Sequence, residues 1–156
     1  MADTAEEEFN RCISKVCCTF NINQLNDYQI KALNSLVMKK KDTFVNLPTG
    51  CGKSLIYQSL PLFNNLSSIV IVVSPLINLM RDQVTLLNSL GISSICLSLV
   101  DDEKTRKEVE NGCYCVVYGS PESWISERWR KMLCNPKYSK SICAVAIDEA
   151  HVINHW

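Results

Sequence analysis

Two short strings of residues carry the chemistry that this sequence suggests. The first is TGCGKS at residues 49–54, and the second is DEAH at residues 148–151. Glycines let the backbone turn tightly so that successive N–H groups point at phosphate oxygens, while a lysine adds positive charge and a serine hydroxyl can bind magnesium. A carboxylate of the second string can reach the same magnesium, and its neighbour can orient water. Together the two strings predict a nucleotide-hydrolase site.

The phosphate loop departs from the strict pattern GxxxxGK[ST], because Leu47 stands where the first glycine is expected. The alternative is a glycine-containing turn before an ordinary helix, with Lys53 merely solvated. An apolar strand candidate before the loop and a helical pattern after it favour the phosphate loop instead. The residues predicted to hold the phosphates are Thr49, Gly50, Cys51, Gly52, Lys53 and Ser54.

Composition predicts a globular chain of one domain. The 156 residues are 47% hydrophobic and 21% charged, which is typical of a folded protein with a real core. Sixteen basic and sixteen acidic residues give a net charge of zero, so bulk charge does not indicate a nucleic-acid partner and any phosphate-binding surface must be local. The one basic run, residues 39–41, is best interpreted as a solvated helix end.

The nine cysteines predict free thiols in a reducing compartment. Their number is odd, they include no CxxC pair, and neither His151 nor His155 completes a zinc-ligand pattern. The longest apolar run, residues 69–73, is far too short to span a bilayer. We therefore expect an intracellular, soluble protein with no membrane partner.

Periodicity predicts an α/β fold. Helices are expected at residues 4–18, where Thr4 and Glu7 can form a capping box, and at 27–39. Apolar strand candidates then alternate with helical stretches. The strands are expected at 43–47, 69–74, 92–97, 115–118 and 142–147, and the helices at 53–64, 75–90, 102–111 and 122–133. Such alternation predicts a parallel sheet with helices on both faces.

Helix ends and strand ends give further expectations. Ser74 should cap the helix that starts at Pro75 and stops at Gly91, and Pro61 should kink its helix without ending it. The polar strings at 49–54, 74–75, 120–121 and 148–149 each follow a predicted strand. Since ligands gather at the carboxyl ends of parallel strands, we expect these strings at one edge of the sheet.

These motifs resemble those of superfamily 2 helicases, and specifically of the RecQ family of DNA helicases. Residues 49–54 are similar to motif I, 73–83 to motif Ia, 118–122 to motif Ib with Ser120 replacing the usual threonine, and 148–151 to motif II. The resemblance covers residues 20–156. It implies a RecA-like P-loop three-layer sandwich with a mostly parallel sheet, incomplete at the C-terminus. Residues 1–25 would form an N-terminal helix and lead-in, and 26–156 part of the first helicase lobe.

The resemblance also implies roles for individual residues, with ATP and Mg²⁺ as ligands. Catalysis would fall to Lys53, Asp148, Glu149 and His151, and magnesium to Ser54 and Asp148. Nucleic-acid contacts would fall to Ser74, Pro75, Arg81, Ser120, Pro121 and Trp156. The exposed helix face around Arg81 also suits a solvated charge, and Trp124 and Trp129 are better interpreted as packing or surface residues than as base-stacking platforms.

Gln29 matches the family residue that hydrogen-bonds adenine. Asn26 stands where the family has a basic residue, and Ile22 where it has the aromatic that stacks on the base. The alternative for Gln29 is a capping-box partner of Asn26 at the start of a helix.

The implied function is the ATP-binding lobe of a 3′-to-5′ DNA helicase, acting on single-stranded or duplex DNA. A second RecA-like lobe with its arginine finger would lie beyond Trp156. A nuclear location is expected, with the cytoplasm or a chromosome-associated pool as other possibilities. Two alternatives stay open: a non-catalytic module that binds nucleotide or nucleic acid, and a lobe of a DEAH- or DEAD-type RNA helicase.

Overall fold

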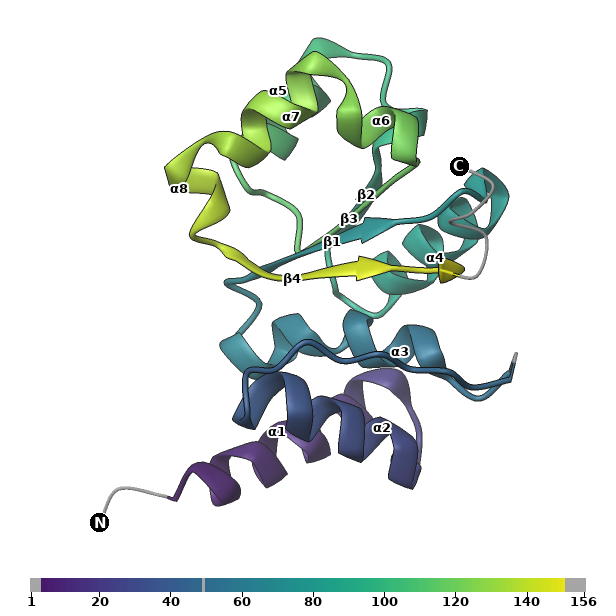
Figure 1. The fold of residues 1–156 in the computed structure, drawn as a ribbon, viewed down its shortest axis with the longest axis vertical. Coiled ribbons are helices and arrows are strands. Elements are labelled where there is room, and N and C mark those ends of the chain that lie inside the picture. The colour runs from purple at the N-terminus through teal and green to yellow at the C-terminus, as the bar shows by residue number, and fades with distance from the viewer. Residues whose placement is uncertain (1–3, 49, 151–156) are drawn as a thin grey trace. The chain divides into compact units, whose positions relative to one another are not determined.

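The chain divides into two compact units, residues 1–65 and 66–156. The computed structural model describes residues 4–48 and 50–150 (Figure 1). Helices make up the regular structure of the first unit, and the second unit contains the parallel sheet. Within the described ranges, the helices are too short or too polar to cross a membrane.

Helices of the first unit pack around a small apolar core. The capping box predicted for its first helix is confirmed: the Glu7 N–H donates to Thr4 Oγ1, and the Thr4 N–H donates to Glu7 Oε2, both at 3.2 Å. The rings of Phe9 and Phe63 lie 5.6 Å apart, centroid to centroid. The elements are α1 (Ala5–Phe20), α2 (Asp27–Leu33), the π-helix η1 (Asn34–Met38), α3 (Lys53–Gln58) and the 3-10 helix η2 (Leu60–Asn64).

The predicted strand at 43–47 is wrong, because this segment has no regular secondary structure. Its side chains alternate between half-buried and exposed, and Phe44 is 82% exposed. The burial pattern alternates as in a strand, yet no described strand pairs with this segment. A strand satisfies its N–H and C=O groups only through a neighbour, so β propensity alone does not make one.

Pro61 ends the α-helix that follows the phosphate loop, where the sequence predicted only a kink. Helix α3 stops at Gln58, and η2 continues with 3-10 hydrogen bonding from Leu60. A proline has no N–H to donate to the preceding turn, and its ring crowds the carbonyl four residues earlier. The tighter 3-10 turn accommodates it, as the bond from the Leu62 N–H to the Ser59 carbonyl at 2.9 Å shows.

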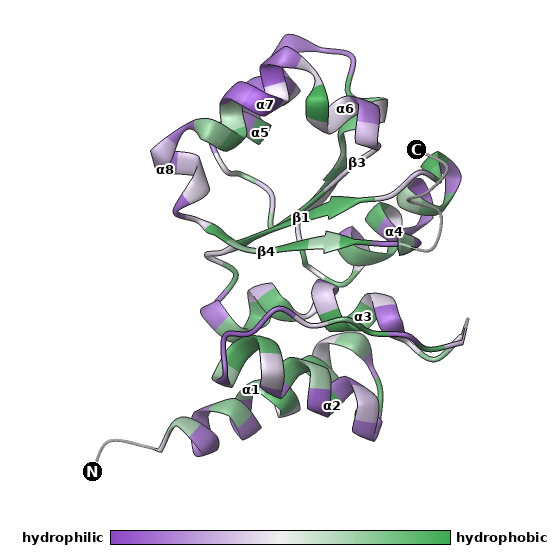
Figure 2. Cartoon of the chain, in the orientation of Figure 1, coloured by the Kyte–Doolittle hydropathy of each residue, from purple (hydrophilic) through white to green (hydrophobic). Residues whose placement is uncertain are grey.

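A four-stranded, all-parallel sheet forms the centre of the second unit, in the order β2-β3-β1-β4. Its strands are apolar, and β1 and β3 are coloured as hydrophobic in Figure 2. Val70 and Val72 are fully buried and alternate with Ile69 and Ile71, which are nearly so, as expected of a sheet covered on both faces. The strands are β1 (Ile69–Val73), β2 (Ser94–Cys96), β3 (Val116–Gly119) and β4 (Ile142–Ile147).

Helices lie on both faces of this sheet, which gives the predicted three layers (Figure 1). The edge strand β4 is covered incompletely, since Val145 is 62% exposed and Ile147 50% exposed. One face is packed by α5, α6, α7 and α8, whose Trp124, Trp129 and Tyr138 form a core cluster with Ile71 and Val117 of the sheet. Helix α4 lies on the other face. The bounds are α4 (Ile77–Ser89), the 3-10 helix η3 (Leu97–Leu99), α5 (Glu103–Glu110), α6 (Pro121–Ile125), α7 (Glu127–Cys134) and α8 (Pro136–Ser139).

Two helix boundaries differ from the sequence prediction. Helix α4 begins at Ile77 and not at Pro75, because the Ser74 hydroxyl accepts the Leu76 N–H at 3.4 Å and holds a turn ahead of the helix. The helix predicted at 122–133 is broken at Ser126, whose backbone is extended and whose hydroxyl donates to the Ser123 carbonyl at 2.6 Å.

Candidate nucleotide and nucleic-acid site

The phosphate loop belongs to the first unit and contains two glycines in the left-handed region. Gly50 has a φ of 88° and Gly52 a φ of 73°, backbone conformations that residues other than glycine rarely adopt. The Cys51 N–H donates to the Pro48 carbonyl at 3.3 Å, which closes a tight turn. Lys53 and Ser54, both half-buried, are the first residues of α3. The two glycines therefore turn the backbone tightly, as expected from their residue type. The binding of phosphate by the loop stays a prediction, and Thr49 lies outside the described residues.

Two amide side chains at the start of α2 contact this loop. Asn26 and Gln29 form a reciprocal capping box, so the alternative interpretation of Gln29 from sequence is present in the structure. In addition, Asn26 Nδ2 donates to the Cys51 carbonyl at 3.4 Å, and Gln29 Nε2 donates to the Gly52 carbonyl at 3.1 Å. A sequence reading cannot find these bonds, since they join residues 25 and 23 positions apart.

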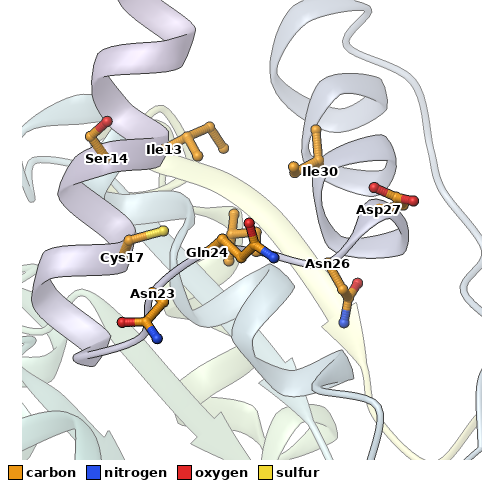
Figure 3. A pocket seen from close by; sticks show the side chains of 9 residues that line it. Ile13, Ser14, Cys17, Asn23, Gln24, Asn26, Asp27 and Ile30 are labelled. Carbon is orange, nitrogen blue, oxygen red and sulfur yellow. The ribbon is translucent and has the colours of Figure 1, made fainter.

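A pocket of about 760 Å³ opens beside the same capping box, between α1 and the start of α2 (Figure 3). Its polar lining comes from both helices and from the connection between them, and its apolar lining includes Ile13 and Ile30. Asn26 lines the pocket, whereas Gln29 is not among its lining residues. The remaining lining residues are Ser14, Cys17, Asn23, Gln24, Leu25 and Asp27.

Three of the predicted polar strings meet at one edge of the sheet in the second unit. The register pairs Val73 with Gly119 and with Ile147, so Ser74, Ser120 and Asp148 each lie one residue beyond the ends of adjacent strands. The Ser74 N–H donates to the Gly119 carbonyl at 3.1 Å, and the Asp148 N–H donates to the Val73 carbonyl at 2.9 Å. The sheet therefore brings these strings together, as parallel strands require.

The carboxylates of the DEAH string lie in a turn directly after β4. Asp148 Oδ1 accepts the Glu149 N–H at 3.0 Å, and Glu149 has a positive φ of 56°. Both residues are half-buried. His151 and Trp156 lie outside the described residues.

The residues predicted to contact nucleic acid have unequal surroundings. Ser120 is the N-cap of α6 and its hydroxyl accepts the Ser123 N–H at 3.1 Å, with Pro121 as the first helical residue, as predicted. Ser74 and Pro75 precede α4 and do not start it. Arg81 is exposed on α4. Trp124 is buried, and its indole N–H donates to the Val72 carbonyl at 3.0 Å. It is therefore a packing residue, one of the two interpretations that its sequence favoured.

No cluster of three or more potential metal-ligating side chains occurs among residues 4–48 and 50–150. All nine cysteines, which fall within these ranges, are free thiols, as predicted. Burial raises the pKa of the Cys96 thiol and of the Cys143 thiol. A raised pKa favours the unreactive thiol form. Cys96 is buried and packs in the core, whereas the residue Cys143 is exposed as a whole.

Comparison with known proteins identifies the class to which this fold and these motifs belong. The model of the DEAD/DEAH box helicase family matches residues 26–156, and the chain belongs to that family. Within it, the relatives are RecQ-type helicases. The chain is 40% identical over 122 residues to the ATP-dependent helicase wrn-1 of Caenorhabditis elegans, and 34% identical over 149 residues to the ATP-dependent DNA helicase RecQ of Haemophilus influenzae.

These matches cover most of this chain but little of the relatives. The two alignments include 77% and 92% of the chain, and 11% and 23% of the respective relatives. A third relative, the ATP-dependent DNA helicase hus2/rqh1 of Schizosaccharomyces pombe, is 32% identical over 88% of the chain and 11% of its own length. The chain is thus homologous to one segment of RecQ-type DNA helicases, and the predicted family is confirmed.

Proposed function

We propose that residues 26–156 are the ATP-binding part of a 3′-to-5′ DNA helicase that couples ATP hydrolysis to strand separation. The observation that carries this proposal is the phosphate loop, whose two glycines adopt the positive φ values that a phosphate cradle needs. The match of the helicase family over the same residues supports it. The relatives named as DNA helicases favour DNA over RNA as the partner.

In this proposal the loop N–H groups and Lys53 hold the phosphates of ATP. Glu149 orients the attacking water, and positioning and electrostatics supply most of the rate enhancement in phosphoryl transfer. His151 relays the state of the site toward DNA. Ser74, Ser120 and Arg81 contact the sugar-phosphate backbone of a single strand, where hydroxyl and N–H donors position the nucleic acid without reading its sequence.

Mg²⁺ fits the residues that the proposal assigns to it. Ser54 offers a hydroxyl and Asp148 a carboxylate, and Mg²⁺ prefers such hard oxygen ligands together with phosphate oxygens. When bound, the ion neutralises charge on the β- and γ-phosphate oxygens.

The full activity further requires a second lobe with an arginine finger. The chain corresponds to only 10–23% of the length of relatives such as the mouse exonuclease/helicase WRN and the bacterial RecQ, which leaves room in those proteins for such a lobe. We also propose a nuclear location for the whole protein, because several relatives are eukaryotic DNA helicases. The proposal rests on these relatives alone, since a bacterial helicase is also similar to this segment.

Calorimetric titration of MgATP against the wild-type chain and Lys53→Ala tests the phosphate site. Loss of a charge-assisted contact should weaken binding by about 1.5–3 kcal/mol, or roughly 10- to 150-fold in Kd. Lys31→Ala is the matched control, because Lys31 is an exposed lysine on α2 of the same unit. Equal affinities for Lys53→Ala and the control would show that the loop does not bind phosphate.

A further inference from the structure

The side chain of Trp124 joins two loops that follow adjacent strands of the sheet. Trp124 lies on α6, in the segment that follows β3, and its indole N–H donates to the Val72 carbonyl of β1 at 3.0 Å. Val72 is followed by Val73, the last residue of β1, and then by Ser74. One side chain from the segment after β3 is therefore bonded to the end of β1.

The same ring lies directly against Gly119, the last residue of β3. A Cβ at Gly119 would lie 2.6 Å from Trp124 Nε1 and 3.1 Å from Trp124 Cδ1, so the ring occupies the space that a side chain would need. Gly119 is also bonded to the loop after β1, because its carbonyl accepts the Ser74 N–H at 3.1 Å. The indole thus contacts the ends of both strands, and the two loops proposed to contact DNA begin at these ends.

The turn that contains Ser120 is attached to Trp124 through the backbone. The Trp124 N–H donates to the Ser120 carbonyl at 3.1 Å, and the Ser123 N–H donates to Ser120 Oγ at 3.1 Å. Helix α6 has only five residues, so it has few hydrogen bonds of its own to fix its direction. The bond from the indole to β1 gives this short helix a second attachment.

Burial makes this attachment rigid. Trp124 is 7% exposed and Val72 is fully buried, so water cannot easily replace the bond between them. Breaking the bond would leave a buried N–H and a buried carbonyl unpaired, which is unfavourable. The separation between the loop after β1 and the loop after β3 is therefore fixed by the core of the second unit.

We propose that Trp124 is a positioning residue for single-stranded DNA, which holds the loops at 74–75 and 120–121 at the separation that one sugar-phosphate backbone requires. This inference rests on the proposed role of these loops in DNA contact. Trp124 is buried, so it acts through the loops and does not touch the DNA itself. Contacts that are already in place bind more tightly, because they do not have to be ordered when the ligand binds.

Two substitutions separate positioning from packing. Trp124→Phe removes the indole N–H and keeps an aromatic ring in the core. Trp129→Phe is the matched control: Trp129 is also 7% exposed and belongs to the same core cluster, and in the part of the chain that the structure describes its indole makes no hydrogen bond to the sheet. Urea unfolding should show a loss of stability in both variants, so destabilisation alone does not distinguish them.

The probe is a fluorescent single strand of about 15 thymidines, titrated into the whole 1–156 chain and followed by anisotropy. Trp124→Phe should weaken binding of the strand by roughly two- to tenfold relative to Trp129→Phe, about the value of one neutral hydrogen bond. Calorimetric titration of MgATP should give the same affinity for both variants, because the proposed phosphate loop belongs to the other unit.

Gly119→Ala disturbs the ring from its other contact and should weaken binding of the strand by a similar factor. The double variant Gly119→Ala/Trp124→Phe should bind no more weakly than the weaker of the two single variants, since both changes act through one ring. Full additivity of the two effects would contradict a shared cause.

Hydrogen exchange of the indole N–H tests the inference on the wild-type chain, without any substitution. A strand that binds the arrangement in which the bond to Val72 is formed also stabilises that bond. Addition of the strand should therefore slow exchange of the Trp124 indole more than exchange of the Trp129 indole. This measurement decides the question if the variants do not fold.

Other outcomes overturn the inference in distinguishable ways. Equal affinities of Trp124→Phe and Trp129→Phe for the strand, or equal effects of the strand on exchange of the two indoles, would show that Trp124 only packs and would leave the proposed function in place. Loss of MgATP binding together with strand binding in Trp124→Phe would indicate a general loss of structure. If the wild type binds MgATP but not the strand, the proposed DNA contacts fail and the inference fails with them.

Discussion

Gly119→Ala should destabilise the second unit because of one rigid neighbour. Gly119 is the last residue of β3 and has no positive φ, so an alanine meets no backbone strain there. A Cβ at this position would lie 2.6 Å from Trp124 Nε1 and 2.9 Å from Trp124 Cε2. The indole cannot easily retreat, since it is 7% exposed, belongs to the core cluster and donates to the Val72 carbonyl.

The expected loss in free energy of unfolding follows from the two ways in which the structure can respond to the added methyl group. Overpacking a well-filled core costs about 1–3 kcal/mol. If the ring moves instead, the Val72 carbonyl loses its bond to the indole N–H, which costs about 1–3 kcal/mol. By either route we expect a loss of about 1–3 kcal/mol, which for a urea slope of about 2 kcal/mol/M lowers the unfolding midpoint by about 0.5–1.5 M.

Urea unfolding followed by tryptophan fluorescence and circular dichroism measures this effect. The decisive comparison is a double-mutant cycle with Trp124→Leu, which removes the ring that the new methyl group would meet. In that background Gly119→Ala should cost less than about 1 kcal/mol, because the steric clash between the new methyl group and the indole ring is absent. An equal cost in both backgrounds would refute the reasoning, since the indole would then have no part in the effect.

Three further predictions concern catalysis and pH. Glu149→Gln in a full-length protein should leave nucleotide binding nearly intact and abolish phosphate release; normal turnover would exclude Glu149 as the water-orienting group. The 1–156 chain alone should not separate duplex DNA and should hydrolyse ATP very slowly, because an arginine finger is worth roughly 10³–10⁵ in turnover; robust DNA-stimulated turnover by a confirmed monomer would contradict this. Arg128 donates to both carboxylate oxygens of Glu103 at 2.8 and 2.7 Å, and this bonding lowers the pKa of Glu103. A carboxyl group whose pKa is lowered in the folded state stabilises the fold at neutral pH, and this stabilisation is lost as the group is protonated. The difference in unfolding free energy between the wild type and Arg128→Gln should therefore shrink between pH 7 and pH 3. A difference that does not depend on pH would exclude the ion pair as its cause.

Several elements could be predicted because their signals are local. The capping box of Thr4 and Glu7 lies within one turn, and the N-cap Asp102 accepts the Thr105 N–H at 2.8 Å three residues on. The strand predicted at 142–147 has the bounds found for β4. Gly91, with a φ of 83°, ends the helix that precedes it, as predicted. In each case the deciding interaction joins residues close together in the chain.

The errors have two different causes. Residues 43–47 have a strand-like composition, but a strand exists only where another strand pairs with it. Pro61 was expected to bend a helix, and its missing N–H and bulky ring instead favoured a 3-10 turn. Ser74 satisfied its hydroxyl with the nearby Leu76 N–H, which delayed the start of α4. Local sterics and hydrogen bonding thus decided the two helix boundaries, whereas the missing partner decided the strand.

The sequence by itself determined the family, the phosphate loop and the alternation of strands and helices, since each depends on residue types at short, fixed spacing. Only the tertiary structure decided that Gln29 bonds to Gly52, 23 residues away, and that Trp124 bonds to Val72, 52 residues away. Such contacts depend on how the helices pack against the loop and the sheet. No local pattern encodes that packing, because it arises from the burial of many side chains together.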